Sequence, residues 1–317
     1  MATILNNGSQ NTVITTGSLP RLLQEGVHKV FGDSLGEWDS KYDKIYDVRK
    51  SSKDYEVDVQ LEGFGLAQRK DQGDDITFDT RSQGYVPKWY HTTYAKGYIV
   101  TEEALEDELY GQLDKGAKAL AKAMAISREY YAHQALNNAW DSNYTMLGGD
   151  GKQLFATDHP NGPSSGTFSN RLTVEADLSE ASMEDLIGII RQALDARGLP
   201  AMLEMKRLVV SAGVNEFNTQ RIMGSVLQND TANNATNASR DLGFIKEGWM
   251  STPYITNTRA WFITTNAPEG LVYFQRRPIV FGQDNSFTTG NARFKASMRQ
   301  SQGWGDPRGC FGGSSGS

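Results

Sequence analysis

The segment TEEALEDELYGQLDKGAKALAKAMAISREYYAHQALNNAW, residues 101–140, carries the strongest structural signal in the chain. Thr101 is a good N-cap residue, and the acidic side chains of the first turns precede several lysines, an order that complements the helix dipole. Apolar residues recur at helical spacing at Leu105, Leu109, Leu113, Ala117, Leu120 and Met124. The pattern predicts one long helix from Thr101 to Trp140, about 60 Å in length, with weak points at Gly111 and Gly116.

The segment before this helix predicts an extended hairpin over residues 55–100. Four apolar residues alternate with polar ones, which is the period of a strand with one wet face: Tyr55, Val57, Val59 and Leu61. The charged stretch QRKDQGDD at residues 68–75 is typical of a hairpin tip, and an aromatic stretch brings the chain back. Each side is far longer than the usual strand of about 5–6 residues. We expect an arm that cannot bury both faces in its own subunit, with an ordinary surface hairpin as the alternative.

The rest of the chain mixes helices and strands without regular alternation. A polar arm, Met1–Leu19, precedes an expected helix at Arg21–Phe31, and further helices are expected at Ser182–Arg197 and Asn215–Ser225. Short strands are expected at Arg207–Ser211, Trp261–Thr265, Leu271–Gln275, Ile279–Phe281 and within Asn291–Ser301. This order predicts an α+β fold with antiparallel or mixed sheets.

Composition excludes several classes of protein. Apolar residues make up 38% and charged residues 22% of the 317 residues, which is typical of a globular chain. The net charge of −6 argues against a protein that mainly neutralises phosphates. Cys310 is the single cysteine, so no intrachain disulfide can form. We find neither an apolar run of the ~18–20 residues that a membrane span needs nor a signal-peptide pattern at the N-terminus.

Motifs for catalysis, metals or cofactors are missing from the sequence. The four histidines lack the spacing of a zinc site, and no nucleotide-binding glycine motif occurs. The pair Asp158-His159 suggests a hydrolytic triad, but no nucleophile elbow accompanies it, and adjacent residues rarely face each other as triad partners. We therefore expect no enzyme activity, no cofactor and no metal, and a hydrolase using Asp158, His159 and an unidentified serine stays open as an alternative.

Two further segments carry a family resemblance. One is LFATDHP at residues 154–160, followed by NRLT at residues 170–173, and the other is QSQGWGDPRGCF at residues 300–311. Together with the order of N-terminal arm, hairpin, long helix and Asn-rich loop (QNDTANNATNASR, residues 228–240), they resemble the major capsid (major head) proteins of tailed bacteriophages, of the type first seen in phage Hong Kong 97. The resemblance covers nearly the whole chain.

This resemblance implies a division of the chain into five parts. Residues 1–40 would form an N-terminal arm, and residues 41–100 the extended loop with its base strands. Residues 101–178 would form a peripheral domain with the long spine helix. Residues 179–266 would form an axial domain, with residues 228–240 as its central loop. Residues 267–317 would return to the peripheral domain and end in a C-terminal tail.

The resemblance also implies a function. The chain would be a structural protein that assembles with itself into hexamers and pentamers, forming the icosahedral head around phage genomic DNA. Partners would be a separate scaffolding protein, a portal and packaged double-stranded DNA through non-specific contact, with decoration proteins as an optional addition and no membrane. The protein would reside in the virion after assembly in the host cytoplasm.

Contacts between subunits are expected at three groups of residues. The apolar row of the hairpin would bury against a neighbour, the charged tip would pair across capsomers, and the Asn-rich loop would lie at the capsomer centre. These residues are Tyr55, Val57, Val59 and Leu61, then Arg69, Lys70, Asp71, Asp74 and Asp75, and then Asn233, Asn234 and Asn237.

Two structural alternatives remain besides the hydrolase. The shell protein of a bacterial nanocompartment shares the fold but encloses enzymes instead of DNA. A sheet-rich phage tail or adhesion subunit is the other, and the long predicted helix argues against it.

Overall fold

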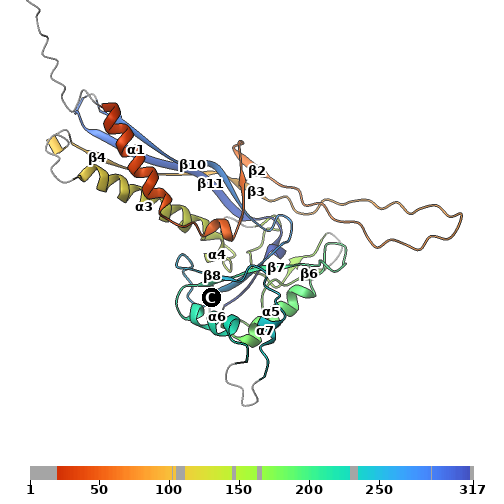
Figure 1. The fold of residues 1–317 in the computed structure, drawn as a ribbon. Coiled ribbons are helices and arrows are strands. Elements are labelled where there is room, and N and C mark those ends of the chain that lie inside the picture. Colours follow the sequence, from red (N-terminus) through yellow and green to blue (C-terminus); the bar gives the residue numbers. More distant parts are fainter. Residues whose placement is uncertain are drawn as a thin grey trace, which may run out of the picture. The chain divides into compact units, whose positions relative to one another are not determined.

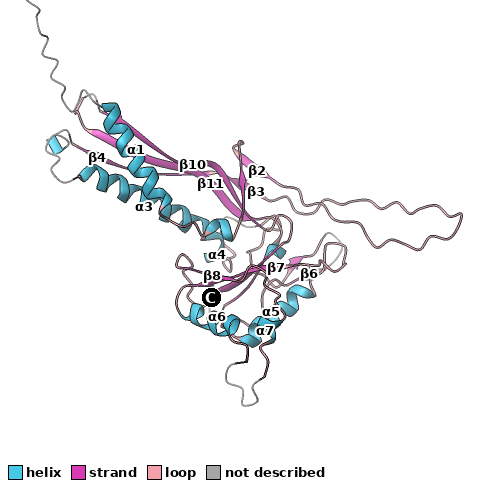
Figure 2. Ribbon diagram, in the orientation of Figure 1, coloured by secondary structure: helices cyan, strands magenta, loops and turns pink. Residues whose placement is uncertain are grey.

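The computed structural model describes residues 20–101, 103–104, 111–144, 148–162, 166–228, 235–286 and 288–314. The chain divides into two compact units (Figures 1 and 2). The first unit comprises the described parts of Met1–Asp39, Tyr94–Ile126 and Ile279–Met298. The second comprises those of Ser40–Thr93, Ser127–Pro278 and Arg299–Ser317.

In the first unit, helices cover strands through an apolar layer. The elements are α1 (Pro20–Gly36), the first part of α3 (Gln112–Ala132), and parts of β4 (Thr92–Val100), β10 (Leu271–Asn285) and β11 (Ala292–Trp304). Phe31 of α1 meets Phe281 of β10 with ring centroids 4.7 Å apart, and Tyr98 of β4 stacks on Phe294 of β11 at 4.8 Å. The predicted apolar stripe is buried at its described positions, Leu113, Ala117, Leu120 and Met124.

The prediction of one helix from Thr101 to Trp140 is wrong in its extent. Gly111 is not helical and has φ of 63°, a left-handed conformation that ends a helical path, and α3 begins directly after it. At the other end the chain turns at His133 and continues only as the short α4 (Gln134–Asn137). Leu105 and Leu109 lie outside the described residues. The helix expected at Arg21–Phe31 is confirmed within α1.

The second unit is built on a mixed sheet with the strand order β12-β9-β7-β8. These strands are β7 (Met205–Ser211), β8 (Trp249–Thr252), β9 (Trp261–Thr265) and β12 (Cys310–Gly313). Strand β7 pairs in parallel with β8 and antiparallel with β9, and β12 pairs antiparallel with β9. The helices of this unit are α5 (Glu180–Arg191), α6 (Val214–Gly224) and α7 (Ala238–Asp241). The predicted α+β class with a mixed sheet is therefore confirmed.

Short elements complete the second unit. Strand β1 (Asp47–Lys50) pairs in parallel with β10 at its residues 272–275, and β5 (His159–Pro160) pairs with β6 (Thr167–Phe168). Two 3-10 helices, η2 (Tyr42–Lys44) and η3 (Pro307–Gly309), lie before β1 and β12. One apolar cluster packs Phe155, Phe262 and Trp304, and a second packs Trp261 with the buried face of α5.

The predicted hairpin is present, but its regular strands are short. Strands β2 (Tyr55–Val57) and β3 (Lys88–Tyr90) pair antiparallel at its base. Beyond them the two sides run alongside each other in extended form, held by an isolated bridge between Leu61 and Gln83 and by scattered backbone hydrogen bonds. Residues 55–90, called the arm below, extend from the rest of the second unit, drawn in orange and brown in Figure 1.

The burial of Leu113 yields a test of the helix face. Leu113→Asp places a charge at a side chain that is only 3% exposed, and we expect the free energy of unfolding to fall by at least about 4 kcal/mol, since truncating a buried Leu alone costs about 2–5 kcal/mol. Lys115→Asp, on the exposed face of the same helix, should change it by less than about 1 kcal/mol. Chemical denaturation followed by circular dichroism measures both; equal stabilities of the two variants would contradict the face assignment.

Candidate assembly surface

The apolar row of the arm faces solvent in the isolated chain. Tyr55, Val57, Val59 and Leu61 are between 39% and 52% exposed. Four neighbouring large apolar side chains at such exposure are unusual on the surface of a soluble monomer, where patches of this kind mark interaction sites. This exposure agrees with the expectation that the arm does not bury its apolar face within its own subunit.

The polar residues of the same strand face the body of the second unit instead. Gln60 donates through Nε2 to Oδ2 of Asp306 at 3.1 Å, and Asp58 lies 3.9 Å from Nη1 of Arg49. Glu62 is only 6% exposed. A strand with one wet face normally turns its apolar residues inward. Here the polarity is reversed, so the apolar row lacks cover from the chain that carries it.

Arg197 holds both sides of the arm at its middle. This residue lies in the loop after α5, in a turn that an isolated β-bridge between Leu194 and Pro200 closes. Its Nε donates to the carbonyl oxygen of Gly63 at 3.2 Å, and its Nη2 donates to the carbonyl oxygen of Thr80. The ion pairs of Arg197 with Glu62 and Asp79, both at 3.6 Å, add charge complementarity. The sequence contained no signal for this contact.

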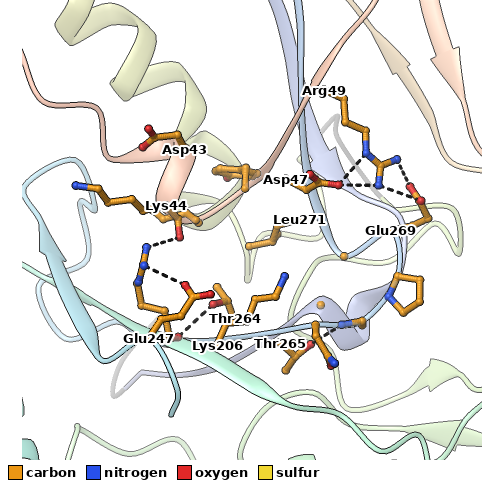
Figure 3. Close-up of a pocket in the computed structure, with 18 residues that line it drawn as sticks. Asp43, Lys44, Asp47, Arg49, Lys206, Glu247, Thr264, Thr265, Glu269 and Leu271 are labelled. Carbon is orange, nitrogen blue, oxygen red and sulfur yellow. Dashed lines mark hydrogen bonds and ion pairs between the residues drawn. The ribbon is translucent and has the colours of Figure 1, made fainter.

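A polar cavity of about 490 Å³ is lined by residues of η2, β1 and the loop between β9 and β10, with Lys206, Arg207, Glu247 and Gly309 (Figure 3). Arg49 of β1 donates to both carboxylate oxygens of Glu269, at 2.5 and 3.0 Å, and pairs with Asp47. The Glu269 carboxylate raises the pKa of Arg49, while burial raises the pKa of Glu269. On the opposite wall Arg207 pairs with Glu247 at 2.9 Å. The lining therefore includes several paired charges, of which Arg49 also reaches Asp58 of the arm, so the cavity suits anchoring of the arm base more than binding of a small apolar ligand.

The outer part of the arm carries apolar residues that the sequence analysis missed. Phe64, Leu66, Ile76 and Phe78 are all exposed, and Leu66 and Phe78 are the most exposed of the four. They flank the charged stretch of the tip. Their alternate spacing in the sequence was the one indication that they share a face of the arm. They enlarge the apolar surface beyond the predicted row.

The predicted tip residues lie at the far end of the arm, where they are exposed. Arg69 pairs with Asp71 at 3.1 Å within the tip itself, and the amide of Asp74 donates to the carbonyl oxygen of Asp71. Lys70 and Asp75 lie in the same exposed stretch. Pairing of the tip with another subunit stays a prediction.

The predicted Asn-rich group is described only at Asn237. Its side chain is buried, caps α7 by accepting from the amide of Arg240 at 3.1 Å, and donates to the carbonyl oxygens of Ile222 and Ser225. The Asn237 amide is thus used within the chain's own fold. Asn233 and Asn234 lie outside the described residues.

The Asp158 and His159 side chains do not form a catalytic pair. His159 has no exposed surface, and its ring contacts Oδ2 of Asp150 at 2.6 Å and the carbonyl oxygen of Leu154 at 3.1 Å. Asp158 instead pairs with Lys152, whose ammonium lowers the pKa of that carboxyl. Both ring nitrogens of His159 are occupied, so the ring is not placed to activate a nucleophile.

The described part of the chain offers neither a metal site nor a membrane-spanning helix. Within it, no group of three or more His, Cys, Asp or Glu side chains has the geometry to hold a metal ion. The helices described there include none that is both long and apolar enough to span a bilayer.

Several solved structures that the chain resembles in fold are capsids or virus-like particles. The capsid of cyanophage P-SCSP1u matches with a TM-score of 0.56 at 10% identity, covering 88% of this chain and 88% of that chain. The virus-like particle from Pyrococcus furiosus matches with a TM-score of 0.54 at 10% identity, covering 91% and 98%. The procapsid of bacteriophage JBD30 matches with a TM-score of 0.52 at 16% identity, covering 96% and 77%. No curated protein sequence matches the chain.

The fold and the uncovered arm define a subunit of a protein shell. The sequence family described as phage capsid protein matches residues 88–312 of the 317-residue chain. The chain therefore belongs to the phage capsid protein family, which confirms the resemblance found in the sequence. Its role is structural, as a capsid shell protein, and the hydrolase alternative is not favoured. The nanocompartment alternative shares the fold, but the family match favours the phage capsid.

The contacts of Arg197 predict how firmly the arm is held. In Arg197→Ala we expect hydrogen exchange of the Glu62 and Gly84 amides, which bond across the arm, to accelerate roughly tenfold, since a hydrogen bond from a charged group contributes about 1.5 kcal/mol. Arg221→Ala, which removes an exposed arginine of α6, serves as the control. Unchanged exchange in Arg197→Ala, measured by mass spectrometry, would show that Arg197 does not hold the arm.

Proposed function

We propose that this chain is the major subunit of an icosahedral phage head, in which it assembles with itself into hexamers and pentamers around double-stranded genomic DNA. The observation that carries the proposal is the reversed polarity of the arm. The apolar row is uncovered because the polar residues that alternate with it bind the rest of the second unit of the same chain. A second copy of the chain supplies the missing cover in a closed shell, where each subunit lies against further copies of the same chain.

The arm interface combines many modest contacts. A fully buried side chain of this kind contributes about 1.5–3 kcal/mol, and each exposed charge pair at the tip at most about 1 kcal/mol. The apolar row therefore dominates, with the tip charges setting the register. Repetition around a closed shell adds these contacts as multivalent binding.

The five expected parts take roles in this assembly. Residues 1–40 act as the N-terminal arm and residues 41–100 as the overlapping loop. Residues 101–178 and 267–317 form the peripheral domain, and residues 179–266 form the axial domain near the capsomer centre. The described helix α3 takes the place of the spine helix, in shorter form than the sequence predicted.

Other partners follow from the proposed head. A separate scaffolding protein would guide assembly in the host cytoplasm, a portal would occupy one vertex, and decoration proteins could cover the outside. Packaged DNA would touch the shell without sequence-specific contacts. The net charge of −6 supports weak binding of that DNA, since tight binding requires clustered positive charge.

Charging the apolar row should block assembly without unfolding the subunit. We expect the double variant Val57→Asp, Val59→Asp to remain folded, because both side chains are already exposed, and to yield no closed particles. Ser52→Asp adds a charge at a nearby exposed position and should assemble like the wild type. Size-exclusion chromatography and electron microscopy measure assembly, and circular dichroism measures folding. Normal particles from the double variant would refute burial of the row.

Deleting the tip tests its smaller contribution. Removal of Arg69–Asp75 should leave a folded subunit that assembles poorly, because the arm loses its charged end while the row remains. The yield of particles per folded subunit, compared at low and high salt, measures the effect. Wild-type yield from the deletion variant at every salt concentration would exclude a role of the tip.

A further inference from the structure

The chain enters the arm through a turn that polar contacts hold. Residues 51–54 join β1 to β2, and the carbonyl oxygen of Lys53 accepts from Nε of Arg276 at 2.9 Å. Asp54 pairs with Arg299 at 2.5 Å, and the amide of Ser51 donates to the carbonyl oxygen of Gln275. The turn therefore depends on hydrogen bonds and charge.

The exit of the arm is held differently. Trp89 of β3 is buried in a small apolar cluster with Val272 and Phe274. Gly303 of β11 lies so close that a Cβ there would approach Nε1 of Trp89 to 2.6 Å. Apolar packing of this kind is insensitive to proton concentration, because it contains no titratable group.

A chain of four side chains links this turn to β11. Oγ of Ser51 donates to Oε1 of Glu56 at 2.7 Å and lies 2.9 Å from Nε2 of His91. On the other side of the ring, Nδ1 of His91 lies 2.9 Å from Oγ of Ser301. Both His91 and Ser301 are buried.

The direction of every bond in this chain follows from the charge of Glu56. The hydrogen bond from Ser51 lowers the pKa of Glu56, so the carboxylate is ionised near neutral pH and can only accept. The hydroxyl of Ser51 donates its hydrogen to Glu56, so the Ser51 oxygen must accept from Nε2–H of His91. The neutral ring then accepts at Nδ1 from the hydroxyl of Ser301.

We propose that this relay is a proton-sensitive joint, in which a proton taken from solvent by Nδ1 of His91 reverses the hydrogen bond with Ser301 and places a positive charge beside Arg276 and Arg299, which hold the entry turn of the arm, so that the turn loosens. The proton adds to the lone pair that accepted the Ser301 hydrogen, so Nδ1 becomes a donor to Oγ of Ser301, and the Ser301 hydrogen must turn to another acceptor in a buried site. The joint lies wholly within the second unit and goes beyond the proposed assembly, because it depends on no contact with another copy.

The charged groups around His91 act in both directions. Burial and the nearby Arg299 and Arg276 lower the pKa of His91, while Glu56 and Asp54 oppose them and the net shift is downward. We call the turn closed when the relay is formed and open when it is not. Because the pKa of His91 is lowered in the closed form, His91 binds protons better in the open form, where its pKa is about 6.5. Stabilisation by the closed relay is therefore present above that pH and is lost as pH falls from about 6.5 towards the lowered pKa.

Hydrogen exchange of the full-length protein tests the joint. After correction for the intrinsic effect of pH on exchange, the Ser51 and Lys53 amides should exchange up to about eightfold faster at about pH 5.5 than at about pH 7, the factor for a group with an open-form pKa of about 6.5. Amides of β7 should keep their protection. An unchanged corrected rate at Ser51 and Lys53 would overturn the proposal.

Three variants separate titration from packing. His91→Gln can donate to Ser51 and accept from Ser301 but cannot titrate, so it should keep the protection seen near neutral pH and lose the acid response. Ser301→Ala removes the hydroxyl that must turn and should also reduce the response, which keeps the test usable if His91→Gln folds poorly. His28→Gln, on α1, should respond like the wild type. A full acid response in His91→Gln or Ser301→Ala would refute the relay.

Discussion

The structure depends on which face of the arm turns inward. Along residues 56–62 the polar side chains bind the body of the second unit, through Asp58 with Arg49 and Glu62 with Arg197. Strand geometry then forces the intervening apolar residues to the opposite face. A shift of one residue would bury the apolar row and expose the acids, which would give a self-contained monomer. The contacts of Arg49 and Arg197 thus oppose that register and favour the one in which the apolar row stays exposed.

The core of the second unit restricts which residues the C-terminal segment can contain. Residues 300–314 are buried throughout, and close approaches need their glycines. A Cβ at Gly309 would lie 2.2 Å from the Cα of Gly270, and one at Gly312 would meet the ring of Phe155. Arg308 is buried there too, pairing with Asp306 and stacking on the ring of Phe168 at 4.3 Å. This segment connects the sheet to the base of the arm, where Gln60 binds Asp306.

Periodic features were predictable from the sequence, and long-range ones were not. The stripe through Leu113 and Met124 predicted the buried face of α3, and the alternation from Tyr55 to Leu61 predicted a strand with one apolar face. The break at Gly111 was flagged only as a weak point, because composition does not reveal a left-handed φ. The hydrogen bonds of Arg197 with Gly63 and Thr80 join residues more than a hundred positions apart, and the sequence around that arginine does not indicate its partners.

The site predictions divide in the same way. The exposed row lies where the alternation placed it, whereas Asn237 caps a helix inside its own chain. The carboxylate that contacts His159 is that of Asp150, which the motif around Asp158 did not suggest. Local pattern gives the orientation of a side chain on its own element, while the partner depends on how distant elements pack. The relay at His91 joins Ser51 and Ser301 and belongs to this second kind.

The most direct test of the account is a cryo-electron microscopy reconstruction of the assembled protein at a resolution that shows side chains. The account predicts a closed shell in which Tyr55, Val57, Val59 and Leu61 are covered by a neighbouring copy, while Arg197 keeps its contacts with Gly63 and Thr80 of its own chain. A closed shell in which the row stays in solvent, or one in which the row packs against its own subunit, would contradict the central claim.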